Sequence, residues 1–409
     1  MGASRAGVTP AGLALGDLRR RLVFVVVLTS GVVASLIYMT LSPILPQMAA
    51  HFGGADGELA AQLGMTMPSL GIMVAGALSG WMVARVGLRP LLLAAFAGVG
   101  VFGSAGGLFG DIWAFSVTRL LLGFSGGFLT TACIALMAEL YDETGRSKMI
   151  GYWKATVGLS VMPVVLGSGA LAEAFGWRMA FAMFAGLAAP VVLLGLLVVP
   201  GFRATAVAET GQGGEHGGVR RIWPIFVMIF VLHIMMMMGG TQLPLVFSQL
   251  GLTSTKTLAL LISVTAPLSG VASLCSGHLQ ARFGERTVLC GGVALTGLGA
   301  VVIGLAPSIG LATAGNALFT LGCGAFLPLY MTMPINRVSA ASRSAAIGLV
   351  QFSMYLGAFV NPLVLAPLRK GLGPDGMYLL IGSLAIAGAA AGGLRLVLLS
   401  RPRTAPAGA

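Results

Sequence analysis

Long apolar stretches recur along the whole chain, and each has about the length that a helix needs to cross a bilayer. A hydrocarbon layer of roughly 30 Å requires about 20 helical residues. The pattern predicts twelve such helices, over residues 22–45, 60–83, 90–109, 112–137, 150–171, 179–199, 222–247, 257–279, 288–306, 309–333, 344–367 and 377–398. No segment shows the alternation of apolar and polar positions that a transmembrane strand requires. The expected fold is therefore an all-α membrane protein with twelve transmembrane helices.

Composition agrees with this expectation and excludes other classes of protein. Hydrophobic residues make up 57% of the 409 residues and charged residues only 9%, against about a quarter charged in soluble chains. So few charges could not cover the surface of a soluble protein of this size, which excludes a cytosolic enzyme, a nucleic-acid binder and a disordered chain. The four cysteines form no C-x-x-C pair, so no zinc site, disulfide framework, metal or cofactor is expected.

The positive charges lie mostly on one side of the predicted helices. Eighteen arginines and lysines fall in one set of loops and termini, whereas the opposite set holds four: Arg178, Lys256, Arg369 and Lys370. Loops rich in arginine and lysine face the cytoplasm in most membrane proteins. The sequence therefore predicts a multi-pass protein of the plasma membrane, of the bacterial inner-membrane type, with both termini cytoplasmic. The net charge of +12 has this origin rather than a nucleic-acid surface.

A polar, glycine-rich segment interrupts the apolar pattern at the middle of the chain. It covers residues 201–221 and has the composition of a flexible linker. It divides the chain into an N-terminal bundle of six helices, residues 1–200, and a C-terminal bundle of six helices, residues 222–409. Within the bundles, Pro43, Pro46, Pro163 and Pro244 are expected to kink or end their helices.

The two bundles are related by an internal repeat. Gly80-Trp-Met-Val-Ala-Arg85-Val-Gly87-Leu-Arg89 and Gly277-His-Leu-Gln-Ala-Arg282-Phe-Gly284-Glu-Arg286 both match G-x-x-x-A-R-x-G-x-R at an offset of 197 residues. The same offset pairs Glu139 with Asn336, Arg146 with Arg343, Arg119 with Asn316, and Lys154 with Gln351. One offset that holds over several helices indicates that the second bundle is a parallel copy of the first.

With these motifs the chain resembles the major facilitator superfamily, and most closely its drug and metabolite:proton antiporters. The paired loop sequences resemble motif A of that family, and Arg119-Leu-Leu-Leu-Gly123 resembles its motif B. Gly158, Pro163 and Gly167 partly resemble its antiporter motif C, although Met162 stands where a glycine is usual. The resemblance implies two pseudo-symmetric six-helix bundles around a midplane cavity that opens alternately to each side.

The repeated loop motif is a candidate gate. Gly80 and Gly277 would let helices approach closely, and Gly87 and Gly284 would permit tight turns. Its arginines could bond helix carbonyls or carboxylates; the acid usual in motif A is replaced by alanine here, so Glu139 and Asp142 are the nearest partners by topology for Arg85. The alternative is that the arginines only set the topology. The candidate gating residues are Gly80, Arg85, Gly87, Arg89, Glu139, Asp142, Arg146, Gly277, Arg282, Gly284, Arg286 and Arg343.

Ionisable groups inside the membrane are few, and each is a functional hypothesis. Arg119 lies roughly 10 Å deep at about 1.5 Å per residue, and no Asp or Glu falls in the core of a predicted helix. Arg119 could therefore bond backbone carbonyls, face a wet cavity, or bind an anionic substrate. A histidine side chain ordinarily titrates near neutral pH, so His233 is, with Arg119, a candidate for proton coupling; the alternative is a neutral histidine bonded to a neighbouring helix. The candidate cavity residues are Arg119, His233, Asn316, Lys154, Gln351, Tyr38, Gln242, Tyr355 and Asn361.

These features predict a secondary transporter, not an enzyme, that moves a small organic solute by alternating access. The resemblance favours proton-coupled efflux of amphipathic compounds, whereas Arg119 without a carboxylate favours uptake or exchange of an organic anion. A lipid or lysolipid flippase on the same fold is a third hypothesis. The expected partners are a small organic substrate, protons as the candidate coupling ion and the lipid bilayer, with no nucleic acid, and the chain is expected to be a monomer.

Overall fold

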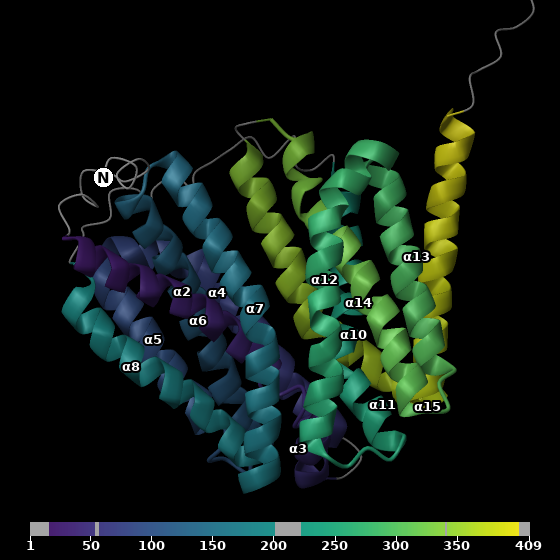
Figure 1. Cartoon of the computed structure of the whole chain (residues 1–409), viewed down its shortest axis with the longest axis horizontal. Coiled ribbons are helices and arrows are strands. Elements are labelled where there is room, and N and C mark those ends of the chain that lie inside the picture. Colours follow the sequence, from purple (N-terminus) through teal and green to yellow (C-terminus); the bar gives the residue numbers. More distant parts are fainter. Residues whose placement is uncertain (1–15, 54–56, 201–221, 340–341, 401–409) are drawn as a thin grey trace, which may run out of the picture.

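The computed structural model describes residues 16–53, 57–200, 222–339 and 342–400, and these residues form helices joined by short turns (Figure 1). The first half contains α2 (Asp17–Met39), α3 (Leu45–Phe52), α4 (Gly57–Val86), α5 (Leu88–Ala105), α6 (Ile112–Leu140), α7 (Glu143–Phe175), η1 (Trp177–Phe181) and α8 (Ala182–Val198). The second half contains α10 (Trp223–Thr241), α11 (Leu243–Gln249), α12 (Thr255–Phe283), α13 (Glu285–Gly304), α14 (Ile309–Thr332), η3 (Ile335–Arg337) and α15 (Arg343–Ser400).

The twelve predicted membrane helices are confirmed. Eleven helical runs of the described residues are long and apolar enough to cross a membrane. The last of these runs is two helices joined at Gly373, whose φ of 70° breaks the helical geometry of α15. The predicted linker, residues 201–221, lies outside the described residues, so its boundaries stay a prediction.

Prolines end two of the membrane helices earlier than the hydrophobic pattern predicts. The helix predicted over residues 22–45 stops at Met39, and a separate short helix, α3, starts at Leu45 with Pro46 in its first turn. The second half has the same break, because α10 stops at Thr241 and α11 has Pro244 in its first turn. Proline lacks a backbone N–H and clashes within a helix but fits the first turn. The expectation that Pro46 and Pro244 interrupt their spans is therefore confirmed.

Each half has its own hydrophobic core. The core of the first half is built around residues such as Leu36, Phe96 and Leu136, and that of the second half around residues such as Ile229 and Phe326. Few side chains cross from one core to the other. Leu245 of α11 is one of them, because it is buried in the core of the first half. The two halves are therefore separate bundles that meet along a limited surface.

The turns of the two halves repeat at the offset found in the sequence. Gly87 and Gly284 both have positive φ, 90° and 82°, at the starts of α5 and α13. Gly176 and Gly373, which are also 197 residues apart, have positive φ as well, 87° and 70°. Only glycine adopts this region without strain, so the expected turn role of Gly87 and Gly284 is confirmed.

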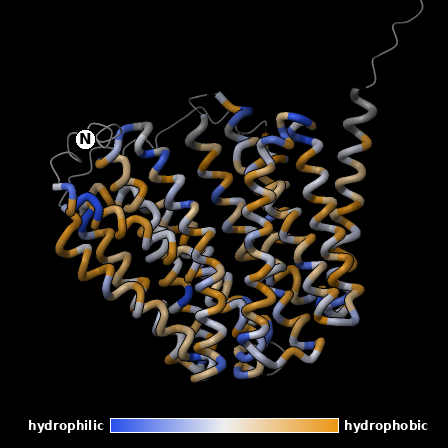
Figure 2. Tube along the Cα trace, in the orientation of Figure 1, coloured by the Kyte–Doolittle hydropathy of each residue, from blue (hydrophilic) through white to orange (hydrophobic). Residues whose placement is uncertain are grey.

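The molecule has two polar ends and apolar sides, as Figure 2 shows by residue hydropathy. We call "linker end" the end where α8 finishes at Val198 and α10 begins at Trp223, and "closed end" the end that holds α3 and α11 (Figure 1). The helices of the two halves converge at the closed end and diverge toward the linker end (Figure 1). Across the halves, α7 packs against α12 and α4 against α15.

Candidate functional site

Polar side chains join the two halves at the closed end, and we call this set the closed-end lock. Its first-half members are Ser42, Gln47, Glu58, Gln62 and Glu173, and its second-half members are Gly240, Gln242, Ser254, Thr255, Lys256 and Arg369. They come from α3 and the neighbouring turn, the first turns of α4 and α12, the last turn of α7, the break between α10 and α11, and α15 before its kink. Opening this end would require each of these contacts to part.

Two glutamines form the most enclosed contact of the lock. The Gln62 Nε2 donates to Gln242 Oε1 at 3.3 Å, and the Gln242 Nε2 donates back to Gln62 Oε1 at 3.0 Å. The side chains are 0% and 1% exposed. Gln242 occupies the break between α10 and α11 that Pro244 creates. Since both amides are away from water, they depend on partners within the protein for their hydrogen bonds, which makes the pair a specific fit between the halves.

An ion pair lies beside the glutamines. Arg369 of α15 pairs through Nη2 with Glu58 of α4, and its Nη1 donates to Gln242 Oε1 at 2.8 Å. The Arg369 side chain is 6% exposed and that of Glu58 45%. The arginine therefore links an amide of its own half to a carboxylate of the other half, and the carboxylate remains accessible to solvent.

Glu173 caps a helix that belongs to the other half. Its Oε2 accepts from the Ser254 hydroxyl at 2.8 Å and from the backbone N–H of Lys256 at 2.7 Å. Ser254 is itself the N-cap of α12, because its Oγ accepts from Thr257 N at 3.2 Å. The first N–H groups of a helix have no partner within the helix, and they attract negative charge. The Glu173 carboxylate of α7 thus accepts a hydrogen bond from a backbone N–H in the first turn of α12.

Smaller contacts complete the lock. Gln47 Nε2 donates to Thr255 Oγ1 at 2.6 Å, and Ser42 Oγ donates to the Gly240 carbonyl at 3.1 Å. At Gly169 the backbones of α7 and α12 approach so closely that an added Cβ would lie 3.0 Å from the Thr255 carbonyl oxygen. Small residues at such crossings let membrane helices pack tightly.

Two tyrosines lie where the halves meet, on the linker side of the glutamine pair. Tyr38 of α2 lies near Ser69 of α4 and Tyr355 of α15. Ser69 lies seven residues further along α4 than Gln62, about 10 Å at the helical rise. The hydroxyls of Tyr38 and Ser69 are enclosed and have no hydrogen-bond partner among the described residues. Contact of Tyr38 and Tyr355 with a substrate stays a prediction. Their position between the halves is compatible with it.

The structure places Arg119 away from the contact between the halves, inside the first half. Its side chain is 0% exposed. Its Nη2 donates to the carbonyls of Phe102 and Gly103 at 2.8 and 2.7 Å, near the end of α5. Arg119 is therefore enclosed in this state, and a role at a wet cavity or with an anionic substrate stays a prediction. Of the three ways to satisfy its charge, the backbone carbonyls are the one observed.

The surroundings of Arg119 explain why it can be enclosed. The last four carbonyls of α5 lack helical partners, and the C-terminal end of a helix favours a cation. The guanidinium carbon also lies 5.3, 4.9 and 5.7 Å from the ring centroids of Phe115, Phe181 and Phe184, within range of cation–π attraction. Arg119 therefore acts as a cap that ties α6 to α5, η1 and α8.

Three predicted cavity residues of the second half are bonded within their own bundle. His233 Nδ1 lies 3.0 Å from Tyr330 Oη, and Asn316 Nδ2 donates to Thr265 Oγ1 at 2.7 Å. Asn361 accepts from Thr241 Oγ1 at 2.9 Å and donates to a carbonyl of α10. All three are buried in this state, and their role as cavity residues stays a prediction. Gln242 is likewise part of the lock rather than open to a substrate. Proton coupling through His233 stays a prediction.

The comparison with known families decides the identity of the fold. The sequence model of the Major Facilitator Superfamily matches residues 27–270 and 225–409 of the chain. This chain belongs to the major facilitator superfamily. The match covers both halves, as the internal repeat leads one to expect, and the twelve helices in two bundles are the fold of that superfamily.

Individual relatives of this superfamily member are transporters of several kinds. Multidrug resistance protein 2 of Bacillus subtilis (strain 168) is 23% identical over 292 residues, which cover 66% of this chain and 70% of that protein. Monocarboxylate transporter 11 of Mus musculus is 26% identical over 397 residues, which cover 88% and 83%. The crystal structure of the nucleoside transporter NupG matches with a TM-score of 0.74 at 12% identity and covers 95% of this chain and all of that one. The chain is thus a multi-pass membrane transporter of the superfamily.

The loop motif of the superfamily lies at the linker end, and its arginines have different partners. Arg89 Nη2 donates to the Leu196 carbonyl at 2.7 Å, near the end of α8, which is the kind of carbonyl contact expected of these arginines. The Arg85 guanidinium carbon lies 5.5 Å from the ring centroid of Trp81 on its own helix. Asp142, proposed as a partner of Arg85, caps α7 by accepting from Gly145 N at 2.8 Å. The predicted carboxylate partner of Arg85 and the gating role of the motif stay predictions.

Other predicted residues of the linker side are exposed or lie outside the described side chains. Lys154, Gln351, Arg146, Arg282 and Arg286 are exposed. Arg343 begins α15, but its side chain lies outside the part of the chain that the structure describes. Pro163 lies inside α7, and the kink expected there stays a prediction. Substrate contact by Lys154 and Gln351 stays a prediction.

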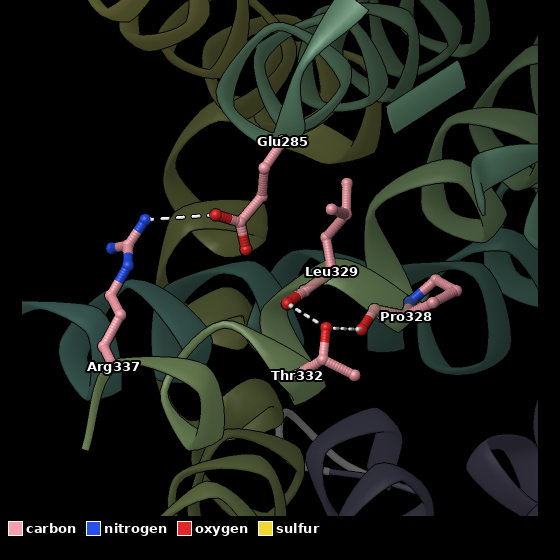
Figure 3. A network of polar contacts seen from close by, with 5 residues as sticks. All are labelled: Glu285, Pro328, Leu329, Thr332 and Arg337. Carbon is pink, nitrogen blue, oxygen red and sulfur yellow. Dashed lines mark hydrogen bonds and ion pairs between the residues drawn. The ribbon is translucent and has the colours of Figure 1, made fainter. Parts of the chain in front are cut away.

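The second half contains an ion pair at the linker end that the sequence did not indicate. Arg337 of η3 donates to Glu285 of α13 at 3.2 Å, and Figure 3 shows the pair beside the last turn of α14. There Thr332 Oγ1 donates to the carbonyls of Pro328 and Leu329, at 3.0 and 3.3 Å. Glu285 belongs to the second copy of the loop motif, so this copy does carry a carboxylate, one residue before its last arginine.

Sequence reasoning also missed the lock. Arg369 was placed on the side opposite the termini but was given no partner, and Glu58, Gln62 and Glu173 were not singled out. Nothing in the spacing of one sequence pairs residues that are 81 to 311 positions apart. The available signal was the small number of charged residues at the closed end. They include carboxylates, such as Glu58, and cations, such as Arg369, which could pair.

Proposed function

We propose that this transporter moves small organic solutes by alternating access and exports amphipathic compounds from the cell, with protons as the coupling ion. The observation that carries the proposal is the asymmetry of the contacts between the halves. The closed-end lock joins them at one end, while their helices diverge toward the other end (Figure 1). Such an arrangement is one of the two states that alternating access requires.

The orientation of this state follows from the charges of the loops. We infer that the linker end faces the cytoplasm, because eighteen arginines and lysines of the sequence belong to that side and four to the other. The state would then be open toward the cytoplasm and closed toward the outside. A membrane-embedded compound or a cytoplasmic solute would enter from the linker end, between the halves.

The chemistry at the meeting of the halves suits an amphipathic solute. Tyr38 and Tyr355 both pack against the apolar core of the first half, and the Met65 side chain reaches Gly240 across the halves. Methionine adapts its shape to different ligands, and hydroxyls offer hydrogen bonds without a fixed charge. Similarity to a multidrug resistance protein supports the direction of export.

The test is transport by the purified full chain in proteoliposomes, with a panel of amphipathic cations, neutral compounds and organic anions, with and without a pH gradient. We expect at least one class to be transported faster with the gradient. To test the lock in the same assay, cysteines replace Gln47 and Thr255, whose side chains are bonded across the halves, in a variant without its native cysteines. A short bifunctional thiol reagent should stop transport.

Each single-cysteine variant treated with the same reagent is the matched control, and it should keep its transport. Transport that continues in the cross-linked double variant would contradict alternating access. If no solute of any class moves, the proposal as a whole fails. If transport occurs but ignores the pH gradient, proton coupling alone fails, and the His233→Gln variant is then expected to behave as the wild type.

A further inference from the structure

Arg369 differs from the other buried cation in the place of its partners. Among the charged residues whose exposure the structure describes, Arg119 and Arg369 are the buried ones. The carbonyls that bind Arg119 belong to its own half, so they stay in place when the halves move. The carboxylate that binds Arg369 belongs to the other half. Opening of the closed end would therefore separate Arg369 from the charge that compensates it.

The same movement would free a second donor beside Arg369. Gln242 accepts from Arg369 Nη1 through its Oε1, which orients the amide, and its Nε2 donates to Gln62 Oε1 of the first half. When the halves part, Arg369 Nη2 loses Glu58 and Gln242 Nε2 loses Gln62. Two N–H donors of the second half are then left side by side, and both had an oxygen of the first half as partner.

We propose that Arg369 and Gln242 form a binding site for the carboxylate group of an organic anion, which takes the place of Glu58 when the closed end opens. The inference rests on the proposed alternating access and names a substrate class for it. A carboxylate has two oxygens and one negative charge, which match the two donors and the single cation. In this structure the carboxylate of Glu58 stands in for that ligand.

The site lies at the closed end, where a solute would leave or enter once that end opens. Arg369 is enclosed in the present state, but the Glu58 side chain that covers it is 45% exposed. Removal of one residue therefore uncovers the guanidinium to solvent on that side. Arg369 has then lost the carboxylate that compensates its charge, so an incoming carboxylate would be favoured over an empty site. The binding of an organic anion, predicted from the sequence for Arg119, is here proposed for Arg369 instead.

The first test removes the internal carboxylate and supplies an external one. The thermal unfolding midpoint of the purified full chain is measured for the wild type, Glu58→Ala and Glu58→Ala/Arg369→Gln, in sodium acetate or sodium chloride at equal ionic strength. We expect acetate to raise the midpoint of Glu58→Ala by about 3 °C or more relative to chloride. The wild type, whose site is occupied by Glu58, and the double variant should show no difference between the salts.

An equal response of Glu58→Ala to the two salts would overturn the proposal, and so would an acetate effect that persists without Arg369. The second test does not depend on the folding of Glu58→Ala. Uptake of radiolabelled benzoate into proteoliposomes is compared among the wild type, Arg369→Gln and Arg369→Lys. Arg369→Gln should lower the initial rate tenfold or more, and Arg369→Lys, which keeps the charge but not the planar donors, should lower it less.

The outcomes separate this inference from the proposed function. If neutral amphipathic compounds are transported but benzoate is not, the carboxylate site is wrong and the transporter remains. Equal benzoate rates in the wild type and Arg369→Gln likewise contradict the site alone. If no solute of any charge is transported, the proposed function fails first.

Discussion

Arg119 of the first half and Asn316 of the second occupy equivalent positions of the repeat, yet they do different things. Arg119 turns outward from the contact between the halves and caps the end of α5. Asn316 donates instead to Thr265 of α12. One position therefore binds the third membrane-spanning helix of its half, α5, and the other binds the second, α12. Equivalence in a repeat fixes where a residue sits on its helix but not which neighbour it contacts.

The backbone around these two residues is the same in both halves. Asp111 and Ser308, which are 197 positions apart, are the N-caps of α6 and α14, and each accepts from the backbone N–H three residues later. The turn glycines Gly87 and Gly284 repeat as well. The repeat is thus preserved in the residues that set turns and helix starts.

The difference comes from a neighbour. Gly106 leaves room for the guanidinium, because an added Cβ there would lie 2.7 Å from the Arg119 Cζ. The equivalent position of the second half is Ile303, which has a much larger, buried side chain. A glycine in one copy and an isoleucine in the other decide whether a long cation fits between the helices.

The largest expected effect comes from Arg119 itself. Arg119→Met keeps most of the volume but leaves two α5 carbonyls without donors, so we expect a loss of about 2–4 kcal/mol in the free energy of unfolding in mixed micelles. The matched change in the other half, Asn316→Leu, removes one hydrogen bond and should cost about 1 kcal/mol. A stable Arg119→Met protein that has lost all transport would contradict the capping role and favour a substrate role.

A second change tests the space beside Arg119. Gly106→Ala forces a Cβ into the guanidinium, and we expect about 1–3 kcal/mol of destabilisation. In an Arg119→Ala background the same alanine should cost much less, because the space is then free. A double-mutant cycle measures this coupling, and additive costs would show that the two residues do not interact.

Where the halves share their backbone, equivalent substitutions should have equal effects. Gly87→Ala and Gly284→Ala each place a side chain at positive φ, which costs roughly 1–2 kcal/mol. Thermal unfolding of the two variants should shift to a similar extent. A large effect in one half and none in the other would mean that the turns of the two copies are not equivalent.

The smallest expected effect concerns the helix starts. Asp111→Ala and Ser308→Ala each remove an N-cap, at a cost of about 1 kcal/mol. Stability measured for the two single variants and for the double variant should add, because the caps lie in different halves. Non-additive values would reveal a coupling between the halves that the structure does not account for.

The helices and the repeat could be predicted from the sequence because they depend on local composition. Twelve apolar stretches, the turn at Gly87 and the break at Pro46 follow from chain chemistry that acts over a few residues. The predicted end of the first span was wrong, because hydropathy does not distinguish the turn between Met39 and Leu45 from the helices on either side of it. Pro43 within this turn and Pro46 just after it were the signals of the break.

The partners that individual side chains contact could not be predicted in the same way. For Arg119 the sequence offered backbone carbonyls, a wet cavity or a substrate, and only the packing of α5 against α6 selects the first. The lock contacts depend on how two bundles meet, so Glu58 and Arg369, 311 positions apart, give no signal within one sequence. Charges at one end of the molecule could suggest such a pair but not establish it.

The most direct measurement uses spin labels at repeat-equivalent positions of both ends. Leu108 and Leu305 are exposed after α5 and α13, toward the closed end, and Tyr152 and Leu349 are exposed on α7 and α15, toward the linker end. In a Glu58→Ala/Glu173→Ala variant, which lacks both carboxylates of the lock, the distance between labels at Leu108 and Leu305 should lengthen while that between Tyr152 and Leu349 shortens. Distances that stay unchanged, or that change in the same direction, would contradict a lock that holds the closed end shut.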